Sequence, residues 1–379
     1  MKRILTFLTA ALSAISLYAQ SDLSYKEWKD GPLTLEDFSQ RKSSGKLIGQ
    51  ISTGIQTYPG DWEKVNWNLR VKRLRSKTVF DPITSWVRSD TLTDQAVRYG
   101  QLLFDATELT RRKMQNHLAA GKYETSYQSI VKRYFAIMDG RIQEIESVTD
   151  EGKNLAELEI QEQNVAEEMA ALEDLTGSLP EYTFRKFAIG FHVGAASQFH
   201  VGNYASVLSP AYGMMLGWNF GIGRSAIYFD MAAYAGAKIM KDIHGDGINV
   251  WKAGEKVNSS DYTLQYAYDV YDGNTFRISP FAGVGVAMIN YNNPVKDAKP
   301  ASDVLGGFRI LAGVSCEFKY LRSLYLAGDP VWSSVYGGLN EHSLRLKVYI
   351  ARTQYSKSAA PCTINCSLTF NLLSKYIKP

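Results

Sequence analysis

The sequence predicts an α+β N-terminal domain followed by an all-β domain in which eight antiparallel strands form a transmembrane barrel. Two observations lead to this fold class. Residues 184–373 contain eight long segments in which apolar side chains alternate with small or polar ones. Successive strand residues point to opposite sides of a sheet, so each segment has one apolar and one polar face. After its first residues the chain contains no run of 18 apolar residues, which leaves strands, not helices, to cross a membrane.

The first 19 residues have the features of a secretory signal peptide. Lys2 and Arg3 precede an apolar run at residues 4–17, and a small residue comes just before Gln20. The run is too short and wrongly flanked for a spanning helix, so we expect it to be removed and the mature chain to start near Gln20.

Residues 20–147 are predicted to form the α+β domain. The segment 28–38 contains Trp28, the run Pro32-Leu33-Thr34 and the pair Asp37-Phe38, and Ser85-Trp86-Val87 follows later. These motifs resemble, in the same order, those of a group of secreted zinc-protease-like (zincin) domains. The resemblance implies that a helix with the zinc-binding motif His-Glu-x-x-His comes next.

The corresponding segment of this chain keeps the residues around that motif but lacks its zinc ligands and its glutamate base. Gln101, Phe104, Asp105 and Glu108 stand where the group has the same residue types, whereas Tyr99, Gly100 and Leu103 replace the first His, the Glu and the second His. A catalytic zinc needs such imidazoles one turn apart, and hydrolysis needs the carboxylate as a base. The sequence therefore predicts a degenerate, noncatalytic domain with no catalytic residue, no metal and no cofactor.

Residues 148–180 are predicted to be an acidic helix and a linker. Residues 155–175 combine helically spaced apolar residues with many glutamates. The simplest interpretation is a solvated helix face, and the alternative is a docking strip for a basic partner or a short coiled coil. A Thr-Gly-Ser-Leu-Pro run at residues 176–180 ends the helices and places the domain boundary before residue 181.

Residues 181–379 are predicted to form the barrel. The alternating segments are 187–194, 212–222, 227–233, 262–270, 282–288, 308–319, 344–350 and 362–372. Their second face is mostly Gly, Ala, Ser, Thr and Asn, which suits a narrow lumen, whereas a soluble barrel would carry Lys and Glu outside. This half of the chain resembles small outer-membrane β-barrel proteins. Cys316, Cys362 and Cys366 share the apolar face and are expected to be free thiols facing lipid.

The connections between the predicted strands suggest an orientation. Links at about 241–260 and 290–303 are long, while those at 221–225 and 272–274 are short. Short turns are periplasmic in such barrels, so the N-terminal domain is expected in the periplasm. The link 321–341 is long where a short one is expected, so either part of it extends a strand or the strand count fails there.

The charged residues that fall on the lumen face by parity include Asp230, Asp269, Arg309, Glu317, Arg345 and Lys347, together with Arg277 and Lys319. Eight strands leave room only for side chains, so we expect a paired internal plug rather than an ion path. His192 also faces the lumen by parity.

The function predicted from these features is an outer-membrane barrel that presents a noncatalytic protease-like domain for a structural or partner-binding role. The expected partners are outer-membrane lipid and a periplasmic or envelope protein. The net charge of +4 gives no indication of nucleic-acid binding. The alternatives are a small-solute pore, a lipid-acting barrel enzyme, or a soluble secreted lipocalin-like barrel that binds a ligand.

Overall fold

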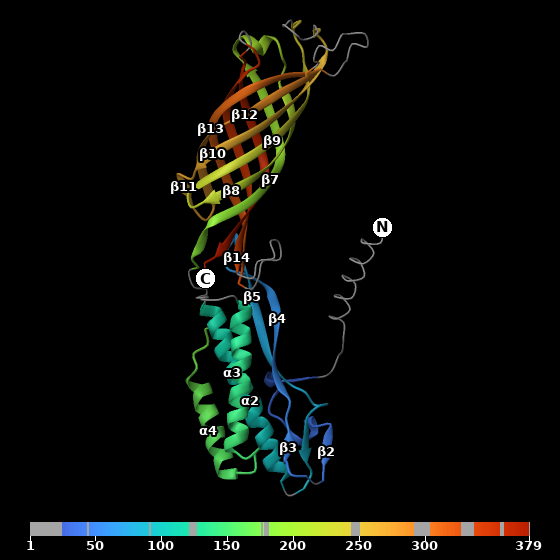
Figure 1. The fold of residues 1–379 in the computed structure, drawn as a ribbon, viewed down its shortest axis with the longest axis vertical. Helices are drawn as coiled ribbons and strands as arrows, with labels where there is room; N and C mark the ends of the chain where they lie inside the picture. Colours follow the sequence, from blue (N-terminus) through green and yellow to red (C-terminus); the bar gives the residue numbers. More distant parts are fainter. Residues whose placement is uncertain are drawn as a thin grey trace. The chain divides into compact units, whose positions relative to one another are not determined.

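A computed structural model describes residues 25–43, 45–90, 92–120, 127–175, 177, 182–243, 251–291, 304–326, 337–356 and 360–378 (Figure 1). The chain divides into two compact units. Unit 1 takes its described residues from 1–58, 75–120 and 128–180, and unit 2 from 59–74, 121–127 and 181–379. The predicted signal peptide, residues 1–19, lies outside the described residues.

Unit 1 contains a small sheet and the base of a long hairpin. Strand β6 (Trp86–Arg88) pairs parallel with β2 (Gln40–Lys42) and antiparallel with β3 (Gly49–Gln50). The hairpin strands are β4 (Thr53–Lys64) and β5 (Leu69–Phe80), and β1 (Lys26–Glu27) pairs with the end of β5. Two single-turn 3-10 helices follow β1, namely η2 (Trp28–Asp30) and η3 (Leu35–Asp37).

Three helices complete unit 1 and lie alongside one another in Figure 1: α2 (Thr93–Ala120), α3 (Tyr127–Val148) and α4 (Leu155–Ala171). Helix α2 supplies the largest share of the core, and its Leu102, Leu103 and Phe104 are almost completely buried. Helix α4 begins where the Asn154 side chain accepts a hydrogen bond from the Glu157 amide, which satisfies one of the unpaired N–H groups of its first turn. Within the described part of the chain, no helix combines the length and apolar character that a membrane crossing requires.

The acidic helix packs on unit 1 through its apolar residues and keeps glutamates such as Glu159 exposed. Leu158 and Val165 of α4 are buried in the core of unit 1. Two of its glutamates pair with cations of α2, through Arg98 to Glu162 at 2.6 Å and Lys113 to Glu168 at 2.6 Å. Part of the acidic face is therefore partnered within the chain, and α4 belongs to unit 1.

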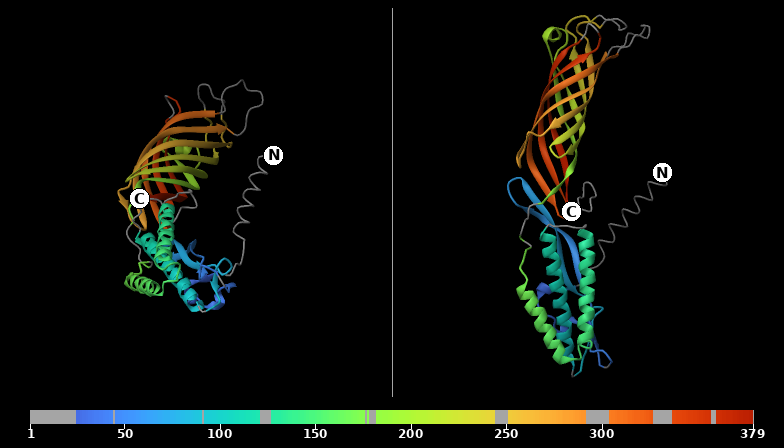
Figure 2. Two further views of the ribbon diagram at one scale, coloured as in Figure 1. Left: turned by 60° about the horizontal axis from the view of Figure 1, so that its bottom comes forward. Right: turned by 60° about the vertical axis from the view of Figure 1, so that its left-hand side comes forward.

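The principal strands of unit 2 form a closed ring of eight, which confirms the predicted antiparallel fold. They are β7 (Phe184–Val201), β8 (Ala211–Ile222), β9 (Ser225–Lys238), β10 (Lys256–Tyr268), β12 (Phe276–Tyr291), β13 (Val304–Tyr325), β14 (Gly338–Gln354) and β15 (Cys362–Ile377). Each pairs antiparallel with its neighbour in sequence, β12 and β13 included, and β15 returns to pair with β7. Figure 2 shows these inclined strands from two further directions.

The two faces of the ring are inverted relative to a soluble protein. On β15, Ile364, Leu368 and Phe370 point outward and are 41%, 52% and 62% exposed, whereas Asn365 and Thr369 between them are at most 1% exposed. All eight strands place large apolar side chains on the outer surface. The apolar stripes predicted from alternation therefore face outward.

The two ends of the ring differ in their connections. At one end, here called the turn end, β8 joins β9 through residues 223–224, and β7 begins and β15 ends. The short strand β11 (Tyr271–Asp272) also lies at this end, between β10 and β12. At the other end, here called the loop end, β9 ends at Lys238 and β10 begins at Lys256, and β12 ends at Tyr291 and β13 begins at Val304. The short 3-10 helix η4 (Gly202–Ser206) follows β7 at this end.

The long link predicted at 321–341 is explained in part by longer strands. Strand β13 continues to Tyr325 and β14 starts at Gly338, and these extensions pair with each other beyond a bulge between Lys319 and Leu321. Residues 327–336 of the link lie outside the described residues. Part of the link therefore extends two strands, and the predicted count of eight strands stands.

The hairpin tip, residues 59–74, belongs to unit 2 although it had been placed in the N-terminal domain at residues 20–147. Strand β12 stops pairing with β13 at Phe318. Beyond that point Leu69–Lys72 of β5 pairs parallel with Arg322–Tyr325 of β13. The tip thereby covers a strand edge that β12 leaves open, and an uncovered edge is a template for unwanted pairing.

Candidate functional site

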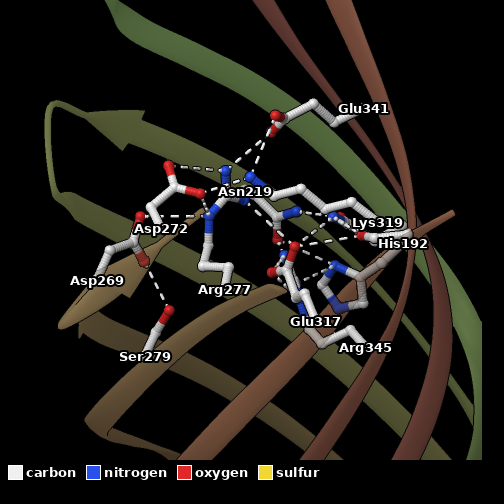
Figure 3. A network of polar contacts seen from close by, with 12 residues as sticks. His192, Asn219, Asp269, Asp272, Arg277, Ser279, Glu317, Lys319, Glu341 and Arg345 are labelled. Carbon is white, nitrogen blue, oxygen red and sulfur yellow. Dashed lines mark hydrogen bonds and ion pairs between the residues drawn. The ribbon is translucent and has the colours of Figure 1, made fainter. Parts of the chain in front are cut away.

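A network of ion pairs fills the lumen of the ring towards its turn end (Figure 3). Its side chains come from all eight strands of the ring and from β11, and those on the ring strands point inward because they share the polar parity of their strands. Most are less than 5% exposed. A charge removed from water to this extent is tolerated only when partners compensate for its lost hydration.

Glu317 on β13 lies at the centre of this network. It accepts hydrogen bonds from Arg345 at 2.7 Å, from Arg277 at 3.2 Å and from Ser343 at 3.2 Å, and the side chain of Asn371 also donates to it. Two guanidinium groups therefore share one carboxylate, and both of its oxygens are occupied.

The network continues towards the turn end through Arg277. Its guanidinium donates to Glu341 at 2.9 Å and to Asp272 at 3.1 Å, and it lies 3.4 Å from Asp269. Asp269 in turn accepts a hydrogen bond from Ser279. Lys319 bridges Asp272 and Glu341 from the neighbouring strand. Each carboxylate in this region therefore meets at least one cation.

A second group of contacts surrounds Asp230 on β9. Lys347 donates to it at 2.7 Å and Gln265 at 2.9 Å, while Nε2 of His192 lies 3.1 Å from its other oxygen. The opposite ring nitrogen of His192 contacts Asn219 at 3.1 Å. A Cβ at Gly217 would lie 2.7 Å from the His192 ring, so only glycine leaves room for the imidazole there.

Arg309 lies apart from these residues. It pairs with Asp261 and donates to Asn365 at 3.0 Å and Thr363 at 3.2 Å. Of the predicted lumen charges, the structure thus joins Glu317 with Arg345 directly and places Asp269 beside Arg277, the second guanidinium group that donates to Glu317. It joins Asp230 with Lys347 and leaves Arg309 with a separate partner.

The sequence prediction had missed three acidic members of these networks. Asp261 has the parity of the lumen-facing Thr263 and Gln265, and extending the predicted strand by one residue would have found it. Asp272 was assigned to a turn, and Glu341 to a link with no pattern of its own. The signal for Glu341 is weak because it depends on the extension of β14 beyond the bulge.

One small cavity lies beside the network. A cavity of about 30 Å³ is lined by residues that include Asp269, Arg277, Tyr228 and Arg345, which is room for about one water molecule. The chemistry that this arrangement performs best is mutual neutralisation, because its donors and acceptors are directed at one another.

The zinc-motif positions in unit 1 occupy its hydrophobic core. Tyr99 and Leu103 of α2 are 3% and 1% exposed, and both belong to the main apolar cluster. A Cβ at Gly100 would lie 3.1 Å from Ile51 and 3.2 Å from Phe38, so Gly100 permits close packing on this side of the helix. Among the described residues, no three His, Cys, Asp or Glu side chains are grouped so that they could hold a metal ion.

Replacing Gly100 with glutamate, the residue found in the zincin motif, is expected to lower the free energy of unfolding of unit 1 by about 1–3 kcal/mol, because the side chain overpacks the core. Urea unfolding of the full chain in detergent, followed by the helical circular-dichroism signal, measures it. Gly140→Glu is the matched control, since nothing lies within 4 Å of a Cβ at Gly140 on α3. Equal stability of both variants would contradict the packing explanation.

The retained motif residues connect the N-terminal segment to α2. The side chain of Gln101 accepts a hydrogen bond from the Leu33 amide at 2.6 Å and donates to Asp105 at 2.7 Å. The indole of Trp28 donates to the same oxygen of Asp105 at 2.7 Å. Residues from two of the motifs that suggested the zincin resemblance are therefore in contact.

Glu108 lies one turn after Asp105 and is almost fully buried. It accepts hydrogen bonds from Thr78 at 2.8 Å, Arg111 at 2.7 Å and Arg112 at 2.8 Å. Burial by itself raises the pKa of Glu108, but the two arginines outweigh this effect and hold the pKa below its usual range. Burial raises the pKa of Asp105.

The lowered pKa of Glu108 predicts acid sensitivity of unit 1. A carboxylate whose pKa is depressed by folding contributes stability above its ordinary pKa of 4.5, and this stability is lost as the pH falls through the folded-state value. Glu108→Gln is therefore expected to destabilise unit 1 at pH 7 and to weaken its loss of stability in acid. Urea midpoints of the helical circular-dichroism signal, measured from pH 7 down to below the ordinary pKa of Glu108, test the prediction. Glu167→Gln, at an exposed position of α4, is the control.

Comparisons with known proteins give similarity only at the level of solved structures. No family model matches the sequence, and no curated protein matches it. The N-terminal β-barrel domain of Pseudomonas aeruginosa OprF is 12% identical, with a TM-score of 0.28, over 50% of this chain and 99% of that one. Neisserial surface protein A is 12% identical, with a TM-score of 0.27, over 50% and 97%. The outer membrane protein OprG of Pseudomonas aeruginosa is 10% identical, with a TM-score of 0.25, over 52% and 98%.

Proposed function

We propose that this protein is an integral outer-membrane barrel, closed by its internal charges, that holds the helical N-terminal domain at the membrane for a structural or partner-binding role. The observation that carries the proposal is the inversion of the ring. Every strand exposes large apolar side chains outward, while charged side chains such as Glu317, Arg345 and Lys347 are buried inside. In water this outer surface would be a very large apolar patch, whereas in lipid it is the favourable one.

A closed ring also suits a membrane because its ladders leave no strand edge in the hydrocarbon. The pairing of β15 with β7 and of β12 with β13 closes this ring. The same inversion disfavours the soluble lipocalin-like alternative, in which the apolar faces would line the interior. The paired charges within the lumen favour a plug over the small-solute pore.

The proposed sidedness follows from the chain ends. The N-terminal domain joins β7 at Phe184, which lies at the turn end together with the short connection at residues 223–224. Short turns of outer-membrane barrels face the periplasm. The domain would therefore be periplasmic. Its proposed role is noncatalytic, because the motif positions Tyr99, Gly100 and Leu103 are committed to packing.

Membrane fractionation combined with gel mobility tests this function. We expect the protein to remain in the outer-membrane fraction after a carbonate wash, and the unheated protein to migrate differently from the heated one. Protease added to intact cells should leave unit 1 uncut, and protease added after permeabilisation should cut it. A protein released by carbonate would refute the barrel, and cleavage of unit 1 in intact cells would refute the sidedness. Conductance in planar bilayers would favour the pore.

A further inference from the structure

The hairpin tip, residues 59–74, is fixed to the turn end of the barrel by its backbone. In addition to the β5–β13 pairing, the side chain of Asn68 donates to the carbonyl oxygens of Asn274 at 2.9 Å and Lys319 at 3.0 Å. The amide of Arg322 donates to the Asn68 carbonyl oxygen at 2.6 Å. Asn68 is buried, so the tip is an integral part of unit 2.

The tip places an indole on the outer surface of the barrel. Trp67 stacks on Phe318 of β13, with ring centroids 6.0 Å apart and an interplanar angle of 17°. Phe318 contacts Phe276 of β12 at 5.4 Å. Trp67 is 58% exposed, and both phenylalanines are also exposed. Phe318 and Phe276 are members of the outward apolar face at the ends of their pairing, so Trp67 continues the lipid-facing surface onto the hairpin.

Basic side chains accompany this aromatic group. Arg70 lies over the ring of Trp62 at 4.1 Å, and Lys72 is 5.8 Å from the same ring. Trp62 packs edge-on against Tyr325 at the end of β13. Indoles and phenols next to cations are typical of the zone between hydrocarbon and water, where aromatic rings sit at headgroup level and cations meet lipid phosphates.

We propose that the hairpin tip is a membrane-interface contact, in which Trp67 lies among phospholipid headgroups of the leaflet at the turn end. The proposal rests on the proposed function, since it requires the barrel to span a membrane. Lipid is the proposed partner because Trp67 stacks on Phe318, which belongs to the outward apolar face of the barrel. That face meets lipid in a barrel that spans a membrane. The tip would then fix the height of the barrel in the bilayer as well as cover the β13 edge.

Photo-crosslinking of the full chain tests this proposal. Benzoylphenylalanine is placed at one of three positions, and the protein is reconstituted in vesicles of phosphatidylethanolamine and phosphatidylglycerol. The positions are Trp67, Phe370 on the apolar face of β15, and Tyr58 in unit 1. All three side chains are exposed, at 58%, 62% and 45%, so none of the replacements should prevent folding.

We expect a lipid adduct at position 67 in a yield comparable with that at position 370, and none at position 58. Adducts at 370 without adducts at 67 would overturn this inference and leave the proposed function intact. Absence of adducts at both positions would refute the proposed function itself. A crosslink from position 67 to a second copy of the chain, or to another protein when the experiment is repeated in cells, would assign the surface to a protein partner and overturn the proposal.

Discussion

Lys347→Met is expected to lower the free energy of unfolding of the barrel by about 3–5 kcal/mol, because it leaves a buried carboxylate without its cation. Lys347 is the one ammonium or guanidinium group that pairs with Asp230 among the described residues. After its removal, Asp230 would retain only the Gln265 amide and the His192 ring. The loss is measured by urea unfolding in lipid vesicles. The fraction folded at each urea concentration is the intensity of the folded band when unheated samples are run on a gel.

A double-variant cycle separates a missing partner from general damage. Combining Lys347→Met with Asp230→Asn removes both charges and should recover most of the lost stability, because no unpaired ion then remains. Leu346→Met, on the outward face of the same strand, is the control and should change the stability by less than about 1.5 kcal/mol. If the double variant were as unstable as the single one, the paired-plug interpretation would fail.

Val348→Arg is expected to destabilise the barrel by about 2–4 kcal/mol in lipid vesicles, the cost of a cation on the lipid face near the bilayer midplane. Val348 is exposed on β14 and stands opposite Val314 of β13 and Cys366 of β15, midway along the part of the strand that lies in the ring. The same urea assay in vesicles measures the effect.

The chain supplies a matched control on the same face. Arg352 of β14 points outward one pair of residues beyond Ile350, towards the loop end, and it is exposed. Because the cost of a charge decreases towards the interface, Arg352→Val should change the stability by about 1 kcal/mol or less. If Val348→Arg left the stability unchanged, the outer face would not meet lipid.

The ring could be predicted from the sequence because alternation is a local signal. Each strand shows its two faces within a few residues, as Asn365 and Leu368 do on β15. The same parity rule identified the charged residues that point inward. It could not identify which of them meet, because the contact between Glu317 and Arg345 depends on the register of β13 against β14.

The features that escaped prediction depend on contacts between distant segments. Strand β13 extends beyond β12 because β5 supplies a partner, and nothing near residue 325 in the sequence indicates this. The glutamates of α4 were expected to meet water, and the partly exposed Glu162 also pairs with Arg98 of α2, 64 residues earlier, which no local pattern predicts. The zincin resemblance was based on local motifs and stays a prediction, while the contact between Trp28 and Asp105 could not be predicted from either motif alone.

The parallel pairing of Leu69–Lys72 with Arg322–Tyr325 also sets an order on assembly. A ribosome makes the hairpin about 250 residues before it makes the strand to which the hairpin binds. Contacts between such distant segments form slowly, because the entropic cost of closing a long loop comes before any stabilisation from the contacts. The hairpin tip is therefore synthesised long before its partner, and Leu69–Lys72 cannot form this pairing until β13 has been made. The hairpin tip is thus the first part of unit 2 to be synthesised and one of the last to form its strand pairing.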